Sequence, residues 1–359
     1  MHLNAAHAMP IGTLLNAKPY EFPGDPKDHR RFTFEAAYDT VFDNVEHEGP
    51  PANGTPIQGE SLPRYRGAHA LGNLDLGGGV TLTAGLWDRD MANKRDRYQV
   101  QSVQAAIQYT LPYQWNGNRM ALRFGYWRND TDQLGKNSFT RIDDYKITSL
   151  AIVNPRDENL QFNFISTREL GRGFNASGYL GVGVSQIGYD RIEGVLRDKK
   201  NCDYRFDLER NSGVVTQMGR CGAIKSLQIE MPTETSIVSN IGINPREALE
   251  YDAVYYQAGI GMGYNTRRWE TSVGYEIRQY HRPGIDAQVT RNGDTPYELN
   301  HNLTLDVGYG IGRATQLFGR AEYESSRLLS SVPFAYNAFT ADRFTQPGLY
   351  FSFGLRMGF

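Results

Sequence analysis

Residues 348–359 read GLYFSFGLRMGF, and this stretch decides the fold. Apolar side chains occupy every second position, namely Leu349, Phe351, Phe353, Leu355, Met357 and Phe359. The positions between them are small, polar or charged: Tyr350, Ser352, Gly354, Arg356 and Gly358. Because successive side chains of a strand point to opposite faces, the alternation predicts a β-strand with one apolar face and one polar or closely packed face.

The same alternation recurs along most of the chain, in pairs of strands joined by tight turns. Turns rich in Gly and Asn, which supply the positive φ that such turns need, are predicted at 77–79, 115–118, 171–173, 265–267 and 312–314. Longer polar segments join the pairs at their other ends, at roughly 44–62, 90–97, 129–157, 190–249, 282–298 and 329–346. Short turns on one side and long loops on the other are typical of outer-membrane barrels.

The number of strands follows from this repeat. Six strands begin near residues 32, 79, 118, 173, 268 and 315, and six others return. The pattern predicts an all-β fold, a closed antiparallel transmembrane β-barrel of about 12 strands. Two further alternating stretches, 138–153 and 226–245, leave 14 strands as the alternative, although 138–153 could instead extend a strand beyond the membrane.

The last strand, with its aromatic end, resembles the closing strand of Gram-negative outer-membrane β-barrels, a broad architecture rather than one family. The resemblance implies that Phe359 is the assembly signal read by the barrel-assembly machinery. It also implies contact with outer-membrane lipid and lipopolysaccharide, short periplasmic turns and long extracellular loops. We therefore expect the chain in the Gram-negative outer membrane.

Composition agrees with a membrane barrel. The chain has 22 Tyr, 17 Phe, 4 Trp and 38 Gly residues but no run of 18 apolar residues, which excludes transmembrane helices. A net charge near −2 argues against nucleic acid as a partner. Aromatic residues are predicted to form two girdles, with Tyr113, Trp115, Tyr264, Trp269 and Phe359 at the short-turn edge and Tyr126, Trp127, Tyr189 and Tyr256 at the other.

Two regions are predicted beside the barrel wall. Residues 1–31, with four prolines and no periodicity, read as a periplasmic or plug-like arm preceding a barrel of residues 32–359. The large extracellular loop 190–249 contains both cysteines, Cys202 and Cys221. We expect these to form a disulfide rather than a metal site, because no histidine lies near them.

Charged residues on the polar faces are predicted to line the lumen or its constriction. They carry both signs: Glu35, Asp39, Arg123, Glu276, Arg278, Asp306, Arg320, Glu322 and Arg356. If the lumen is wet, these charges set a field across a constriction; if it is dry, they form a salt-bridge lattice that closes the barrel. Neither a one-sided basic wall nor a row of inward aromatics is apparent, so the sequence does not identify a substrate.

The sequence predicts no enzyme, cofactor or metal. No histidine has a serine two positions away, as the outer-membrane phospholipases require. His281 with Asp286 and His301 with Asp294 are the nearest approach to a protease pair, and neither has a recognisable spacing.

The favoured function is a channel, or porin, for passive passage of small polar solutes. The alternative is a structural or docking barrel, closed by internal ion pairs, that binds an envelope protein or surface polysaccharide.

Overall fold

The computed structural model describes residues 31–41, 64–92, 97–136, 140–142, 145–209, 212–218, 221, 226–230, 249–291, 295–312, 314–326, 332–337, 341 and 347–359. The predicted arm, residues 1–31, lies outside the described residues except for Arg31. Among the described residues, no helix is long and apolar enough to cross a bilayer.

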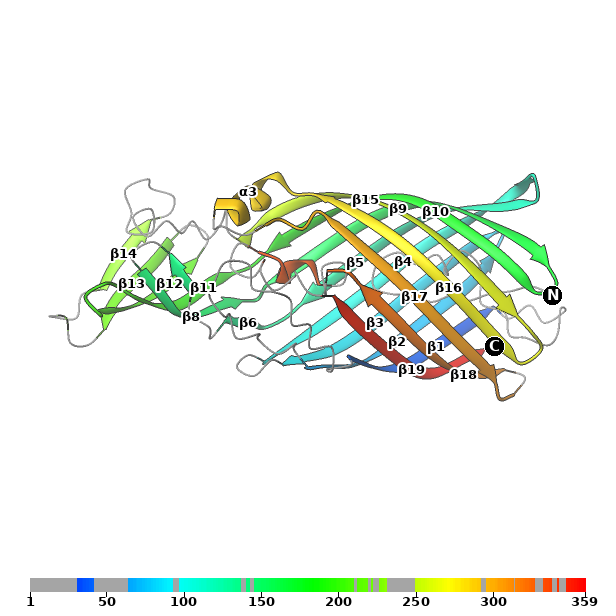
Figure 1. Cartoon of the computed structure of the whole chain (residues 1–359), viewed down its shortest axis with the longest axis horizontal. Helices are drawn as coiled ribbons and strands as arrows, with labels where there is room; N and C mark the ends of the chain where they lie inside the picture. Colours follow the sequence, from blue (N-terminus) through cyan, green and yellow to red (C-terminus); the bar gives the residue numbers. More distant parts are fainter. Residues whose placement is uncertain are drawn as a thin grey trace, which may run out of the picture.

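Twelve antiparallel strands close into a barrel, in the order β1-β19-β18-β17-β16-β15-β10-β9-β5-β4-β3-β2 (Figure 1). The predicted twelve strands are therefore confirmed and fourteen is wrong. Their bounds are β1 Phe32–Val41, β2 Arg64–Gly77, β3 Val80–Ala92, β4 Arg97–Trp115, β5 Asn118–Asp130, β9 Arg156–Gly171, β10 Phe174–Gly188, β15 Tyr251–Asn265, β16 Trp269–His281, β17 Leu299–Gly310, β18 Thr315–Glu324 and β19 Gly348–Gly358.

Residues 348–359, which contain β19, close the barrel. β19 pairs with β18 on one side and with β1 on the other, where Glu35 stands opposite Arg356. The rings of Phe32 and Phe359 stack with centroids 6.2 Å apart at the end of this seam. The first and last strands are thus hydrogen-bonded along their length.

Three of the five predicted tight turns, at 77–79, 115–118 and 171–173, have the predicted positive φ, whereas the described residues of 265–267 and 312–314 do not. Asn116 and Gly117 both have positive φ, 49° and 79°, between β4 and β5, as a two-residue hairpin turn requires. Gly171, Arg172 and Gly173 are likewise all at positive φ between β9 and β10. These turns lie at the end of the barrel where β19 finishes (Figure 1).

The outer surface of the barrel is an apolar belt. Alternate residues of neighbouring strands are exposed and apolar, among them Phe162, Phe164, Leu180, Val182, Ile260, Met262, Val273, Leu303 and Leu305. An even-numbered closed barrel with such a belt is the architecture of Gram-negative outer-membrane proteins, and we place the chain in that membrane.

The aromatic girdle needs one correction. Tyr113, Trp115, Tyr264, Trp269 and Phe359 are exposed at the short-turn edge as predicted. At the other edge Tyr256 is exposed, but Trp127 and Tyr189 are only 3% and 5% exposed, and Tyr189 belongs to a buried apolar core just after β10. Trp127 directly follows the outward-facing Tyr126, so the two-residue period places its ring in the lumen.

A second sheet extends beyond the long-loop end of the barrel, at the left of Figure 1. Its strands are β6 Gln133–Lys136, β7 Thr140–Ile142, β8 Tyr145–Val153, β11 Arg191–Arg197, β12 Asp203–Glu209, β13 Ser212–Met218 and β14 Ser226–Glu230. The segment predicted as loop 190–249 therefore contains four strands. The predicted disulfide joins Cys202 and Cys221.

One buried apolar core runs from the barrel mouth into the second sheet. Tyr251, Tyr255, Ile285 and Val289 belong to it at the mouth, and Ile147, Ile192, Leu196 and Phe206 in the second sheet. Helix α3, Pro283–Arg291, and the short 3₁₀ helix η2, Pro333–Ala335, complete this core. The mouth is thus filled by side chains.

Candidate functional site

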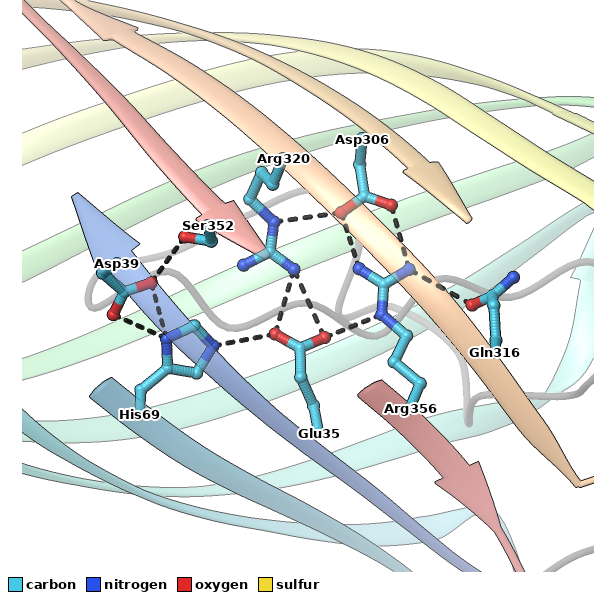
Figure 2. Close-up of polar contacts among 8 residues, drawn as sticks. All are labelled: Glu35, Asp39, His69, Asp306, Gln316, Arg320, Ser352 and Arg356. Carbon is cyan, nitrogen blue, oxygen red and sulfur yellow. Dashed lines mark hydrogen bonds and ion pairs between the residues drawn. The ribbon is translucent and has the colours of Figure 1, made fainter. Parts of the chain in front are cut away.

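Five of the predicted lumen charges come together on one side of the barrel. Glu35 and Asp39 lie on β1, Asp306 on β17, Arg320 on β18 and Arg356 on β19. Strand register explains the meeting, because Asp306 stands opposite Arg320 and Glu35 opposite Arg356. With His69 of β2, these residues form what we call the ion-pair network (Figure 2).

Two carboxylates and two guanidiniums alternate at its centre. Arg356 donates from Nε to Glu35 Oε2 at 2.8 Å and from Nη2 to Asp306 Oδ2 at 2.6 Å. Arg320 makes the parallel contacts, from Nη2 to Glu35 Oε1 at 3.1 Å and from Nε to Asp306 Oδ2 at 3.0 Å. All four side chains are almost fully buried, so their charges neutralise one another with little solvent screening.

His69 extends the network. Its Nδ1 lies 2.8 Å from Asp39 Oδ2 and its Nε2 lies 3.0 Å from Glu35 Oε1. Both ring nitrogens can donate to carboxylates only in the imidazolium form, which balances the network with three anions and three cations. Ser352 donates to Asp39 Oδ1 at 2.6 Å. Sequence reasoning passed over His69, although its position two residues before the inward-facing Leu71 places it in the lumen.

The floor of the network is aromatic. Phe318 of β18 lies beneath both guanidiniums, with Arg356 Cζ 3.9 Å and Arg320 Cζ 5.3 Å from its ring centroid. Gln316 accepts from Arg356 Nη1 at 3.3 Å and donates to Glu270 Oε2 at 3.1 Å. The paired charges therefore rest on a packed support.

The other four predicted lumen charges are also buried; Glu322 lies on β18 two residues after Arg320, whereas Arg123, Glu276 and Arg278 make contacts outside the network. Arg278 donates to Glu276 on the same strand at 2.9 Å, and Tyr179 donates to Glu276. Glu322 accepts from Asn302 at 2.6 Å. Arg123 stands opposite Asn163 on the far wall.

That far wall, made by β4, β5, β9, β10 and β15, carries amides and aromatic rings. Its buried inward side chains include Gln104, Gln108, Gln161, Asn163 and Gln257, with Trp127, Tyr179 and Tyr255 among them. Trp87 of β3 meets Trp127 edge-on at 4.8 Å between centroids. The sequence showed no row of inward aromatic residues; in the structure Trp127, which was assigned to the outer girdle, faces the lumen together with Tyr179 and Tyr255.

A segment between β18 and β19 covers the lumen at its outer end. Residues 332–337, here called the mouth segment, are all buried. The Tyr251 hydroxyl lies 3.0 Å from the carbonyl oxygens of both Pro333 and Tyr336. The Phe334 backbone N–H donates to Asp157 Oδ2 at 3.2 Å, and Asp157 Oδ1 accepts from Asn129 and Asn159. The wall and the mouth segment are thus joined by a few named hydrogen bonds.

Helix α3 holds the other side of the mouth segment. Tyr336 donates from its hydroxyl to Asp286 Oδ1 at 3.2 Å, and Arg282 lies over the Tyr336 ring at 4.0 Å. Burial raises the pKa of the Asp286 carboxyl above its usual range, while the Arg282 guanidinium opposes this shift. Burial also raises the pKa of Tyr336 to about 12, which keeps its hydroxyl protonated and able to donate.

The described residues contain no group of three His, Cys, Asp or Glu side chains that could hold a metal ion. His301, considered above for catalysis, contacts the Tyr275 hydroxyl through Nδ1 at 2.6 Å on the outer surface of the barrel. Asp286, considered with His281, is instead bound by Tyr336 and Arg282.

Comparison with known proteins gives distant likenesses only. No protein-family model matches the chain, and no curated protein matches it. Among solved structures, the translocator domain of the autotransporter NalP from Neisseria meningitidis is similar at 10% identity and a TM-score of 0.44, covering 92% of this chain and 88% of that one. The NanC porin is similar at 8% identity and a TM-score of 0.38, covering 90% of this chain and 98% of that one.

The outer-membrane phospholipase A from Escherichia coli is similar at 10% identity and a TM-score of 0.32, covering 96% of this chain and 95% of that one. All three TM-scores are below 0.5, so none of these proteins indicates a function for this chain. Its own strand pairing and lipid-facing belt identify it as an outer-membrane β-barrel closed by 12 antiparallel strands.

Proposed function

We propose that this protein is a gated outer-membrane channel for small polar solutes, described here in its closed state. The observation that carries the proposal is the nature of the closure at the mouth. The mouth segment belongs to a connection between strands, and Tyr251 and Asp157 bind it through hydrogen bonds to its backbone. Such a segment can withdraw without breaking any strand pairing, as lids and loops do in other proteins.

The ion-pair network has a different role in this proposal. It ties β1, β2, β17, β18 and β19 together through buried contacts, so that wall keeps its shape when the mouth opens. The far wall carries mostly neutral amides, with Arg123 among them, and is the side that the mouth segment touches through Asp157. Barrels of 8 strands are filled by side chains and barrels of 16 enclose a water-filled channel, so twelve strands leave room for a narrow path.

We propose transport without catalysis and without a cofactor. The inward histidine, His69, is bound by two carboxylates and has no hydroxyl nucleophile against its ring in the contacts described above. A base held in this way cannot accept a proton from a substrate, because both of its nitrogens already donate.

Single-channel conductance in planar bilayers tests the proposal. The wild-type protein should be silent or open rarely. A Tyr251→Phe/Phe334→Ala variant, called the open-mouth variant, loses the hydroxyl that binds the mouth segment and the ring that fills the mouth. It should conduct in stable steps.

A matched variant, Tyr256→Phe/Phe353→Ala, makes the same chemical changes at exposed positions on the lipid-facing surface. It should behave like the wild type. Folding of each variant is judged by its electrophoretic mobility without prior heating. An open-mouth variant that folds but stays silent would refute the gate.

The second sheet favours a second candidate, docking of an envelope protein or polysaccharide. Its charged side chains pair on one face, with Arg191 bound to Glu193 at 2.7 Å and Arg197 to Asp203 at 2.7 Å, and it extends beyond the barrel (Figure 1). Docking predicts a different result in the same bilayer experiment. Both the wild type and the open-mouth variant would be silent, and surface binding would be lost on removal of residues 191–230.

A further inference from the structure

Four side chains of the far wall face one another across adjacent strands. Gln104 of β4 stands opposite Trp127 of β5, Trp127 opposite Asn159 of β9, and Asn159 opposite Ser185 of β10. They are 4%, 3%, 2% and 3% exposed, respectively. We call these four residues the polar row.

Each member of the polar row has a buried polar atom with no hydrogen-bond partner among the described residues. The atoms are Gln104 Oε1, Trp127 Nε1, Asn159 Oδ1 and Ser185 Oγ. Native proteins satisfy nearly all buried polar groups, so four such atoms at facing positions on consecutive strands call for an explanation. Together they offer two carbonyl acceptors, one N–H donor and one hydroxyl that can do either.

The surroundings of the polar row are mostly neutral and aromatic. Trp87 lies edge-on to Trp127, and its ring covers Gly85, the residue opposite Gln104 on β3. Two charged groups are close. The Arg89 guanidinium lies 5.3 Å from the centroid of the Trp127 ring, and Asp157 accepts the Asn159 amide. These two charges have opposite sign, so the row as a whole presents neither an anionic nor a cationic surface.

The mouth segment lies directly next to this row. Asp157, which accepts the Phe334 N–H, is two residues before Asn159 on the same face of β9 and binds the Asn159 amide. In the closed state the four polar atoms are covered by protein. Withdrawal of the mouth segment would bring them into reach of the outside.

We propose that the polar row is a binding site for a neutral, polyhydroxylated solute, a short uncharged saccharide, that becomes accessible when the mouth opens. This rests on the gated channel proposed above. Sugar hydroxyls both donate and accept, which matches the mixture of groups on the row, and the C–H face of a sugar packs on indole rings such as those of Trp87 and Trp127. An ionised solute would find no net charge on the row, because the two charged groups beside it, Arg89 and Asp157, have opposite sign.

The test uses the open-mouth variant of the full chain in planar bilayers, with maltotriose as the probe. Maltotriose should interrupt the ion current in a saturable, concentration-dependent way. Trigalacturonate, which is anionic, and triglycine, which offers amides without hydroxyls, should interrupt the current far less. Equal interruption by triglycine would overturn the saccharide assignment.

Substitutions in the open-mouth background then locate the site. Gln104→Leu and Ser185→Ala should each raise the half-blocking concentration of maltotriose about tenfold, since each removes one hydrogen-bonding group. Trp127→Phe keeps an aromatic ring and loses the N–H. It tests the same site if the other two variants fail to fold. Gln279→Leu, at an exposed position on β16, is the matched control and should change nothing.

The outcomes separate the two proposals. A silent open-mouth variant would overturn the gate and the site together. A conducting variant that maltotriose does not interrupt, or in which the row substitutions leave the half-blocking concentration unchanged, would overturn the site and leave the channel standing.

Discussion

At the scale of single residues, the lumen is a set of charges that depend on one another. Glu35 accepts from Arg320 and Arg356 and contacts His69, so its removal affects three cations at once. Removal of one partner from a buried ion pair leaves an uncompensated charge, which costs far more than the pair contributes. Pairwise balance, rather than any single contact, stabilises this wall.

Glu35→Gln should therefore lower the free energy of unfolding by about 3–5 kcal/mol. The double variant Glu35→Gln/Arg356→Gln removes one charge of each sign and should cost less than the sum of its two single variants. Urea titration of the barrel in lipid vesicles, followed by tryptophan fluorescence, measures both. Strict additivity would show that the charges do not act together.

Asp286 gives the mouth a pH dependence. Its pKa is raised in the folded protein, so the stability that Asp286 contributes to the folded state is fully present below the usual aspartate pKa of about 4 and is lost as the pH rises through the raised value. Arg282 and Glu298 are the charged groups whose fields act on it, in opposite directions. Hydrogen exchange of the Ala335 and Tyr336 amides, corrected for intrinsic rates, should therefore become faster as the pH rises.

Asp286→Asn should abolish this pH dependence. The measurement would run between about pH 4 and pH 8, where Arg282 stays charged. If the exchange rate rises with pH to the same extent in Asp286→Asn, Asp286 is not the source of the pH dependence.

At the scale of elements, the two sheets are stabilised differently. The barrel strands are paired on both sides around a closed ring, whereas the second sheet is open-edged and has a disulfide between Cys202, just before β12, and Cys221, after β13. The sequence predicted the barrel strands well because their outward rows are uniformly apolar, as in β19. It took β11 for part of a loop because Arg191, Glu193 and Arg197 alternate with only a few apolar residues.

Replacing both cysteines by serine should destabilise the second sheet and spare the barrel. Closing a loop of 19 residues stabilises by about 3 kcal/mol in the chain-entropy account. Limited proteolysis should therefore cut residues 191–218 faster, while the barrel keeps its heat-dependent electrophoretic mobility. Unchanged proteolysis would mean that the apolar core alone holds this sheet.

The candidate site was harder to predict than the strands. Register alone brings Glu35 to Arg356, so their proximity follows once the barrel is assumed to close. The mouth segment could not be foreseen, because VPFAYN has no periodicity and its burial depends on tertiary contacts with Tyr251 and Asp157. Trp127 was misplaced by one position in the alternation, which is enough to move a ring from lipid to lumen.

At the scale of the whole molecule, the protein has three environments along its length. Short turns and an exposed aromatic edge lie at one end, an apolar belt surrounds the middle, and the second sheet extends from the other end (Figure 1). Each environment tolerates different side chains at exposed positions.

Ile260→Arg in the apolar belt and Val214→Arg in the second sheet should differ in their cost to folding. Ile260 is an exposed residue of the membrane-spanning strand β15, so a charge there should cost about 2–4 kcal/mol of folding into vesicles. Val214 is exposed on β13, beyond the barrel, and the same change should be nearly neutral. Similar costs at both sites would contradict the assigned membrane position.

The pairing of β1 with β19 also bears on how the barrel is assembled. Glu35 is near the start of the described chain, while its partner Arg356 lies 321 residues later, on the last strand. Until that strand arrives, Glu35 and Asp39 lack the contacts that Arg356 and Ser352 supply. A chain that stops short, or pairs its ends in the wrong register, would leave these carboxylates uncompensated at an open seam. The contacts across this seam therefore favour, in free energy, a closed barrel in the correct register over one that leaves these carboxylates uncompensated.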